Sequence, residues 1–270
     1  MRSVFFLFLA IVTVVTGSVI SHADDVPTIV PNRSRMLLYF GRNLSLTFSE
    51  FSDYWRGPHA RLFLNTTVVK QNLLRYEQLH VNQEWKQKLR DRGLDVPEFD
   101  GILVAEAVTL DKILEAFNNP EYNEIVIPDT LKFANFSTAL YAGFKITTVF
   151  DKLPRNPPLG VIRKDVQTLV VDTPKFLDVI RTTGANGVFS KYELNTLDPV
   201  KPTVDVPFPS LTEWDEVAML SGPTLGKVVD ELKNPKVIDF LRKDAPNFVE
   251  VSKGIDFVPC DVVSFNIPKS

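Results

Sequence analysis

Cysteine is almost missing from this chain, which has a single one, Cys260, among 270 residues. One thiol cannot form an internal disulfide, so an apolar core must stabilise the fold, and a chain of this length can bury one. No basic residue that would activate the thiol lies near Cys260 in the sequence, which favours a buried structural position on a C-terminal strand. A disulfide scaffold is therefore excluded, and a catalytic thiol is disfavoured.

Signatures of the common metal and cofactor sites are missing as well. The chain has three histidines, and no HExxH, CxxC or EF-hand spacing occurs. The GxG-like element at residues 184–187 fits a turn and lacks a dinucleotide fingerprint, and no GxSxG elbow is present. We therefore expect no metal and no cofactor.

Long apolar spans and an excess of basic charge are also lacking. No segment reaches the roughly 18 consecutive apolar residues of a membrane helix. The 30 Lys and Arg residues stand against 33 Asp and Glu, so the net charge of −3 gives no basis for binding nucleic acid or an anionic membrane. The short apolar run Val4 to Val15 follows Arg2 and precedes the small-residue triplet Ser21-His22-Ala23. This layout predicts a secretory signal peptide at residues 1–23, cleaved after Ala23, and a secreted mature protein.

Glycosylation sequons, in contrast, are frequent in the first half of the chain. Their asparagines are Asn32, Asn43, Asn65 and Asn135. One three-residue pattern alone is a weak signal, but four in a secreted chain predict a eukaryotic secretory route and a glycoprotein.

The chain also contains an internal repeat. Residues 100–133 align without a gap on residues 215–248, and several columns that differ exchange one apolar residue for another. The identical pairs are Asp100 and Asp215, Thr109 and Thr224, Leu110 and Leu225, Lys112 and Lys227, Asn119 and Asn234, Pro120 and Pro235, Asp129 and Asp244, and Phe133 and Phe248. The period is too long for a solenoid, so the repeat indicates a duplicated supersecondary unit.

Each copy of the repeat predicts the same order of elements. In the first copy, an apolar strand over 101–108 leads into a helix capped by Thr109, the helix stops at Asn119-Pro120, and a strand over 138–150 closes the unit. Upstream, strands over 36–40 and 73–81 flank a helix that the capping box Thr47-Phe-Ser-Glu50 opens. We therefore predict an α+β fold of two tandem ferredoxin-like β-α-β-β-α-β halves, residues 24–150 and 151–270, joined by a proline-rich linker. The halves are expected to form an intramolecular pseudo-dimeric α/β barrel.

Three pieces of the sequence together resemble the EthD family of dimeric α/β-barrel proteins. They are FSDYWRGPHA, the strand RYEQLH and the segment EFDGILVAEAVTLDKILEAFNNPEYNEIVIPD. The resemblance is good over residues 36–134 and faint over 162–257. It implies a ferredoxin-like barrel, usually built by two chains and here by two halves of one. It also implies the handling of hydrophobic, often aromatic or polyketide-derived molecules without a metal.

The family pattern maps onto five residues of the first half, Tyr54, Trp55, His59, Tyr76 and His80. The second half keeps only Tyr76, repeated as Tyr192, which favours a structural role for that residue. The other four are lost, because Val179 and Ile180 replace the Tyr-Trp pair, no histidine follows them, and Thr196 stands opposite His80. A purely architectural role would be needed in both halves, so the loss favours ligand contact, although packing is the ordinary role of a single histidine or aromatic residue. Asp129 resembles a recurrent acidic position of the family, but its repetition in the second half favours a structural role at a helix end.

The local sequence suggests how the two histidines would meet. Gly57-Pro58 is expected to kink or restart the helix and to place His59 near a positive N-terminus. His80 shares a strand face with Tyr76, and if this face points into the barrel, both imidazoles lie in one apolar cavity. Neutral imidazoles there would bind a phenol or enol and move its proton.

Two hypotheses about function remain open. The first is a secreted, cofactor-independent enzyme that acts on a hydrophobic aromatic or polyketide-like compound, with His59 and His80 as catalytic groups and Tyr54, Trp55 and Tyr76 as substrate-binding residues. The second is a non-catalytic secreted small-molecule carrier or host-directed effector that uses the barrel as a scaffold. In both, the protein is expected to be a monomer with an internal pseudo-dimer, without nucleic-acid partners and without an integral membrane segment.

Overall fold

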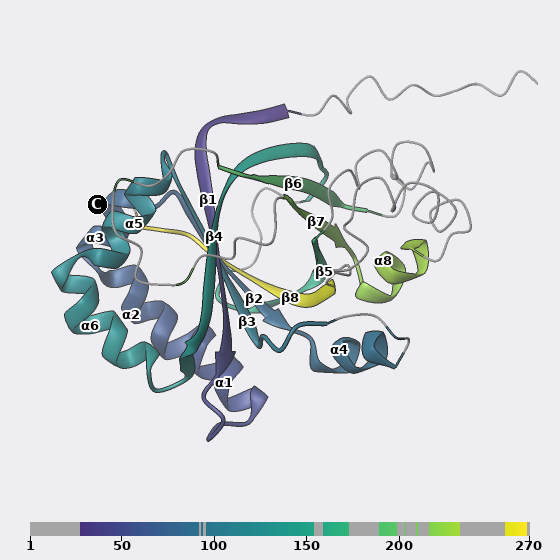
Figure 1. Cartoon of the computed structure of the whole chain (residues 1–270), viewed down its shortest axis with the longest axis horizontal. Helices are drawn as coiled ribbons and strands as arrows, with labels where there is room; N and C mark the ends of the chain where they lie inside the picture. Colours follow the sequence, from purple (N-terminus) through teal and green to yellow (C-terminus); the bar gives the residue numbers. More distant parts are fainter. Residues whose placement is uncertain are drawn as a thin grey trace, which may run out of the picture.

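The protein is built around a closed barrel of antiparallel strands, with helices packed on its outside (Figure 1). The computed structural model describes residues 28–91, 93, 96–153, 159–172, 189–198, 203, 209, 216–232 and 257–268. The predicted signal peptide and the helix expected after residue 172 lie outside the described residues. Within the described part, the mixed α+β character and the closed barrel are confirmed.

Eight strands form the barrel. They are β1 (Thr28–Arg42), β2 (Arg75–Val81), β3 (Gly101–Ala107), β4 (Ala134–Asp151), β5 (Ile162–Asp172), β6 (Lys191–Leu197), β7 (Glu216–Gly222) and β8 (Phe257–Phe265). Around the barrel the order is β4-β1-β3-β2-β8-β5-β7-β6, and β6 pairs with β4 to close it. The first four strands therefore follow the ferredoxin-like order 4-1-3-2, and the last four follow the same order among themselves.

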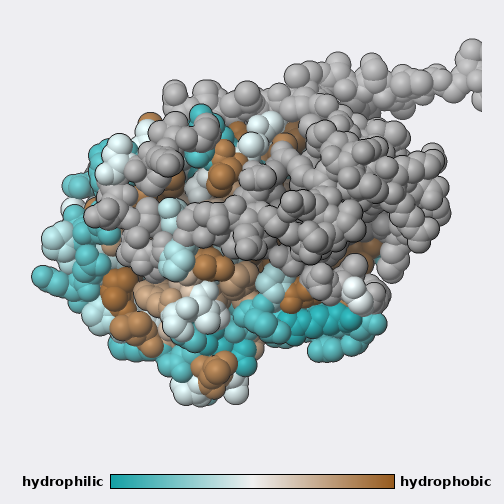
Figure 2. Space-filling view, viewed as in Figure 1, coloured by the Kyte–Doolittle hydropathy of each residue, from teal (hydrophilic) through white to brown (hydrophobic). Residues whose placement is uncertain are grey.

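The described helices cover the outside of the barrel. They are α1 (Phe48–Tyr54), a π-helical turn η1 (Trp55–His59), α2 (Ala60–Asn65), α3 (Thr67–Asn72), α4 (Gln83–Arg90), α5 (Leu110–Asn118), α6 (Pro120–Thr130) and α8 (Leu225–Leu232). The surface over α4 is mainly hydrophilic (Figure 2), as expected for a helix that packs on one side only. No helix among the described residues is long and apolar enough to cross a membrane.

Several helix ends lie where the sequence predicts them. Thr47 and Glu50 form the capping box at the start of α1. Thr109 caps α5 by accepting a hydrogen bond from the backbone N–H of Lys112. Asn119 caps α6, and Pro120 occupies the first turn of that helix, where its missing N–H removes no helical hydrogen bond.

Alternation along the strands separates an outer face, under the helices, from the barrel interior. On β1, Met36, Leu38 and Phe40 pack under the helices of the first half, whereas Leu37 and Tyr39 belong to the interior cluster. Cys260 lies in the same interior cluster, where burial raises the pKa of its thiol well above the usual range. The buried structural role expected for this cysteine is confirmed.

Candidate functional site

The His80 side chain does not point into the barrel, so the condition for a cavity shared with His59 is not met. On β2, Tyr76 packs with the outer core under the helices, while Leu79 belongs to the barrel interior, and alternation places His80 on the outer side with Tyr76. The His80 ring lies 4.6 Å from the Trp55 ring and is 1% exposed. The physical reason is the apolar pattern of β2, because Leu79 and Val81 on the other face fill the interior instead.

The hydrogen bonds of His80 define its tautomer. Nε2 lies 3.0 Å from the amide oxygen of Gln78, which can only accept, so Nε2 carries the proton. Nδ1 then accepts from the Ser52 hydroxyl at 2.9 Å. Gln78 in turn donates to the Tyr76 hydroxyl at 2.7 Å and to the Trp55 carbonyl at 3.0 Å. Both imidazole nitrogens are thus engaged within the packed layer.

We expect the His80 imidazole to stay neutral at all pH values above about 3, because burial lowers its pKa from 6.5 to about 3. Between these two values the unfolded chain binds more protons than the folded protein, so this residue makes the protein less stable as the pH falls. Nitrogen NMR shifts of the ring measure the titration directly. Protonation of His80 in the folded state above pH 5 would contradict the packed position.

His59 lies in a second polar group, at the C-terminal end of α6. Its Nδ1 is 2.9 Å from Asp129 Oδ2, and the Tyr54 hydroxyl donates to Asp129 Oδ1 at 2.6 Å. Lys132 also reaches Asp129, at 3.0 Å. Burial raises the pKa of Asp129, but these hydrogen bonds outweigh it and hold the pKa below its usual range, whereas burial lowers the pKa of His59. Asp129 therefore ties two of the predicted site residues to α6, a contact that sequence reasoning did not identify.

The helix does not restart before His59. Gly57-Pro58 lies inside η1, and His59 has helical dihedrals of φ −64° and ψ −46° that lead directly into α2. The widened π-helical turn accommodates the proline, which lacks the N–H of an ordinary helical residue. The expected helix N-terminus beside His59 is therefore absent from the described chain.

Trp55 fills the space in which the two histidines were expected to meet. It is 1% exposed, and its ring centroid lies 4.9 Å from Phe40 and 5.6 Å from Phe51. The opposing backbone has Gly101, where an added Cβ would lie 2.6 Å from the indole. The described residues therefore form no open cavity between His59 and His80, and the roles of the two histidines as acid and base stay a prediction.

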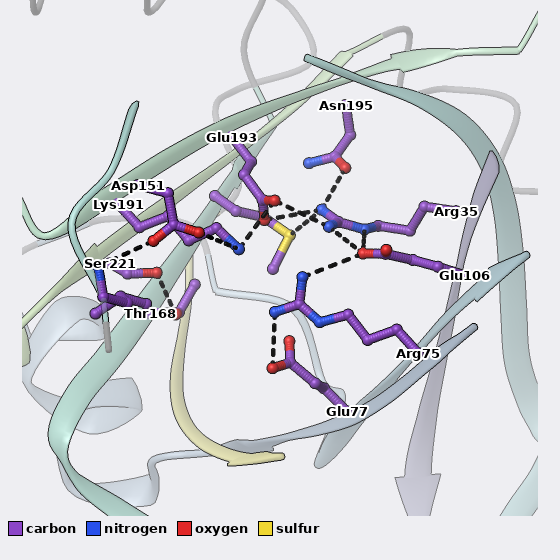
Figure 3. A network of polar contacts seen from close by, with 12 residues as sticks. Arg35, Arg75, Glu77, Glu106, Asp151, Thr168, Lys191, Glu193, Asn195 and Ser221 are labelled. Atoms are coloured by element: carbon purple, nitrogen blue, oxygen red, sulfur yellow. Dashed lines mark hydrogen bonds and ion pairs between the residues drawn. The ribbon is translucent and has the colours of Figure 1, made fainter. Parts of the chain in front are cut away.

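A different polar group lies inside the barrel (Figure 3). Arg35 on β1 donates to Glu106 on β3, with its Nη2 2.5 Å from Oε1. Across the interior it forms two bonds of 3.1 Å to the carboxylate of Glu193 on β6, and it donates to Asn195 Oδ1 at 2.8 Å. Arg35 thus links strands of the first four to a strand of the last four.

The polar group continues toward one end of the barrel through Arg75, Glu77 and Lys191 (Figure 3). Arg75 contacts Glu77 at 2.8 Å and Glu106 at 3.3 Å. Ser264 on β8 donates to Glu77 at 2.8 Å, and Lys191 lies 2.9 Å from Glu193. We call these charged residues, together with Arg35, Glu106 and Glu193, the interior network.

Arg35, Glu106 and Glu193 are ionised at neutral pH. Burial raises the pKa of Glu106 and Glu193, but the neighbouring cations, Arg35 first among them, outweigh burial and hold the pKa of both carboxylates below the usual range. Burial also lowers the pKa of Arg35, and the same two carboxylates reverse this and raise it. Because each buried charge has an opposite partner, the network is stable only as a whole.

A cavity of about 770 Å³ opens at this end of the barrel. Its charged lining residues are Arg33, Arg75, Glu77, Asp151, Arg163 and Lys191. Its apolar lining includes Leu74, Leu153, Leu159, Phe265 and Ile267. We call this the mouth cavity, and it brings part of the interior network into contact with solvent.

None of the predicted site residues lines the mouth cavity, although Tyr76 supports its wall from behind. The Tyr76 ring stacks on Phe265 at 5.2 Å, and Phe265 lines the cavity. The sequence did carry a signal for this site, since Arg75-Tyr-Glu77 and Lys191-Tyr-Glu193 each place two charges on one face of a strand. Charges at alternate positions of a buried strand point to a polar interior.

Three of the four sequon asparagines, Asn43, Asn65 and Asn135, are at least partly exposed. Asn43 and Asn135 each accept hydrogen bonds from the backbone and hydroxyl of the serine two residues later. Asn65 is exposed at the end of α2, while Asn32 lies within β1. These positions leave glycosylation a prediction.

Comparisons with known proteins support the family and the fold. The family model of the EthD domain matches residues 43–137, and no curated protein matches the chain. A protein of Fusobacterium nucleatum subsp. nucleatum, named as a candidate monooxygenase, is similar in structure with a TM-score of 0.54 at 9% identity, over 88% of this chain and 96% of that one. An anthrone oxidase-like protein is similar with a TM-score of 0.52, also at 9% identity, over 90% of this chain and 98% of the other. At such identity these likenesses show the fold alone.

The family match does not extend into the second half, where the resemblance is faint and the polar residues of the first helix are replaced. The capped helices, the strand order and the barrel are nevertheless those that the resemblance implies. The protein therefore carries an EthD domain at residues 43–137, in a chain that closes into the barrel of this fold.

Proposed function

We propose that this protein binds a hydrophobic aromatic or polyketide-like small molecule in the mouth cavity. The observation that carries the proposal is the cavity itself, since about 770 Å³ lies within the range of small-molecule sites. The lining combines apolar groups, among them Leu74 and Phe265, with guanidinium and carboxylate groups. A ligand with an apolar body and one polar end fits such a lining.

The buried positions of His59 and His80 favour a binding function over catalysis. His59 and His80 are 2% and 1% exposed, and each contributes a ring nitrogen to a hydrogen bond within the packed layer. An enzyme that used both as acid and base would need its substrate between α1 and the sheet, where Trp55 lies. The cofactor-independent enzyme is therefore the second candidate, favoured only by the presence of both histidines in the EthD domain.

We further propose that the barrel is an internal pseudo-dimer of two ferredoxin-like halves. The shared strand order of β1–β4 and β5–β8 supports this. So do the aligned helix starts, because Thr109 and Thr224 both accept from the backbone N–H of a lysine three residues later. A single chain with both halves needs no partner to close the barrel, which supports a monomer.

We infer a secreted carrier or host-directed effector as the setting for this binding. The supporting observations are the N-terminal layout, with Arg2 before the apolar run and Ala23 at the predicted cleavage position, and the four sequons. The names of the two structural neighbours, a candidate monooxygenase and an anthrone oxidase-like protein, guide the choice of polycyclic phenols as test compounds.

The test is calorimetric titration of the mature protein with hydroxylated naphthalenes and anthraquinones. Wild type is expected to bind at least one of them with a Kd in the micromolar range, about −8 kcal/mol. Leu74→Trp, at a 45% exposed position on the cavity wall, should weaken that binding at least fivefold, because the indole occupies ligand space.

The matched control is Leu131→Trp. Leu131 is also an exposed leucine, at 53%, and it follows α6 away from the mouth cavity. It should leave the affinity unchanged. Absence of binding across the panel, or equal weakening by both tryptophan variants, would contradict the proposed site. Chromatography of the recovered compounds tests the enzyme alternative, which predicts a chemically altered product.

A further inference from the structure

The charged part of the mouth cavity is biased toward cations. Of its six charged lining residues, Arg33, Arg75, Arg163 and Lys191 are basic, whereas Glu77 and Asp151 are acidic. This bias occurs in a chain whose net charge is −3. The overall composition therefore does not explain the excess of basic residues in the cavity lining. That excess comes from how the charged side chains are distributed along the barrel.

The carboxylates of the network lie deeper than the guanidiniums that reach the cavity. The side chain of Glu106 is 1% exposed, whereas those of Arg33 and Arg75 are 44% and 31% exposed. Both arginines contact Glu106 from the cavity side at 3.3 Å, while Arg35 contacts it from the interior at 2.5 Å. One carboxylate is thus shared by three guanidiniums, and the two at the mouth are the more distant ones.

Each guanidinium has five N–H donors in a planar fork. Arg33 contacts Glu106 through Nη1, and nearly half of its side chain is open to solvent. Arg75 uses Nη1 for Glu106 and Nη2 for Glu77 and is also partly open. The two arginines are therefore held in place by buried carboxylates and still present donors to the cavity. A carboxylate is the group whose two oxygens match such a fork.

We propose that the mouth cavity selects an organic carboxylate, whose acid group binds Arg33 and Arg75 and whose apolar body packs against Leu74, Leu153 and Phe265. The inference rests on the proposed binding function and names the chemical class of its ligand. Glu106 acts as a positioning residue, because it contacts both guanidiniums and does not line the cavity, whereas Glu77 holds Arg75 from within the cavity lining.

Two probes of matched size separate the carboxylate from the rest of the ligand. 2-Naphthoate and 2-naphthamide have the same ring and differ in charge, so calorimetry of the mature wild-type protein with each compares the acid group alone. The carboxylate is expected to bind about tenfold more tightly, the size of one charge-assisted hydrogen bond. Equal affinities would overturn the inference, and this comparison needs no variant.

Arg33→Gln tests whether Arg33 binds the carboxylate of the ligand. Arg33 is half-exposed, and without its charge Glu106 is still paired with two other arginines. The variant should weaken 2-naphthoate about tenfold and change 2-naphthamide less than twofold. Arg56→Gln is the matched control, since Arg56 is also a partly exposed, paired arginine outside the mouth cavity, and it should change neither affinity. A loss of naphthoate affinity in Arg56→Gln equal to that in Arg33→Gln would overturn the assignment.

The two proposals fail in different ways. If both probes bind equally and Leu74→Trp weakens both, the cavity binds small molecules without selecting acids, so the inference fails and the binding function stands. If neither probe binds and the panel of phenols does not bind either, both fail.

Discussion

Arg35→Met should lower the free energy of unfolding by about 3–5 kcal/mol, the usual loss when one partner of a buried ion pair is removed. Arg35 is 1% exposed and contacts both Glu106 and Glu193. Methionine keeps much of the side-chain length, so the principal change is two buried carboxylates that lose their central cation. Urea denaturation of wild type and variant at pH 7 measures the difference.

Two controls separate the charge effect from lost packing. Arg56→Met removes an exposed ion pair with Asp53 and should cost less than about 1 kcal/mol. The double variant of Arg35→Met with Glu193→Gln removes one of the carboxylates that lost this cation and should be more stable than Arg35→Met alone. A double variant as unstable as the sum of its single changes would mean that Arg35 acts through packing.

The loss in Arg35→Met should shrink in acid. In wild type the pKa values of Glu106 and Glu193 are lowered in the folded state, so their contribution is present above their unfolded pKa of about 4.3 and is lost as the pH falls below it. In the variant, protonation neutralises carboxylates that have lost their central cation. The difference between the two proteins therefore narrows below about pH 4, whereas a packing defect would persist.

The sequence predicted the fold well because the fold depends on local signals. Caps at Thr47 and Thr109 and the alternation along β2 and β3 each determine an element from a few neighbouring residues. The sequence repeat adds a prediction of two such units, which the shared strand order of β1–β4 and β5–β8 supports. Helix α4 was not predicted, although Asn82 caps it, because its only buried residues are Lys86 and Leu89 and its apolar pattern is weak.

The candidate site could not be predicted in the same way, since it depends on which strand face points inward. Alternation places His80 opposite Leu79, but it does not say which of the two meets the helices. That choice is made by tertiary packing, in which Trp55 and Phe51 need a partner under α1. The charged pairs Arg75/Glu77 and Lys191/Glu193 were visible in the sequence. Arg75 and Glu77 face the interior because the opposite face of β2, which carries His80, packs against the helices.

Trp55→Ala should also cost about 3–5 kcal/mol of unfolding free energy, because it leaves a large cavity between η1 and the sheet. The indole contacts His80 at 4.6 Å, and Gly101 keeps the opposing backbone free of a side chain, so no neighbour is placed to fill the space.

Adding indole should restore part of the stability in the variant and none in wild type, since a ligand stabilises the state that binds it. Trp85→Ala, at a partly buried tryptophan on α4, is the control and should cost less and show no rescue.

In Trp55→Ala, better access of water in the cavity should also raise the pKa of His80 toward its usual value, because burial is what lowers it. A loss below about 1 kcal/mol, without rescue, would mean that this layer is open in solution, and the histidine pair would again be the better candidate for the ligand site.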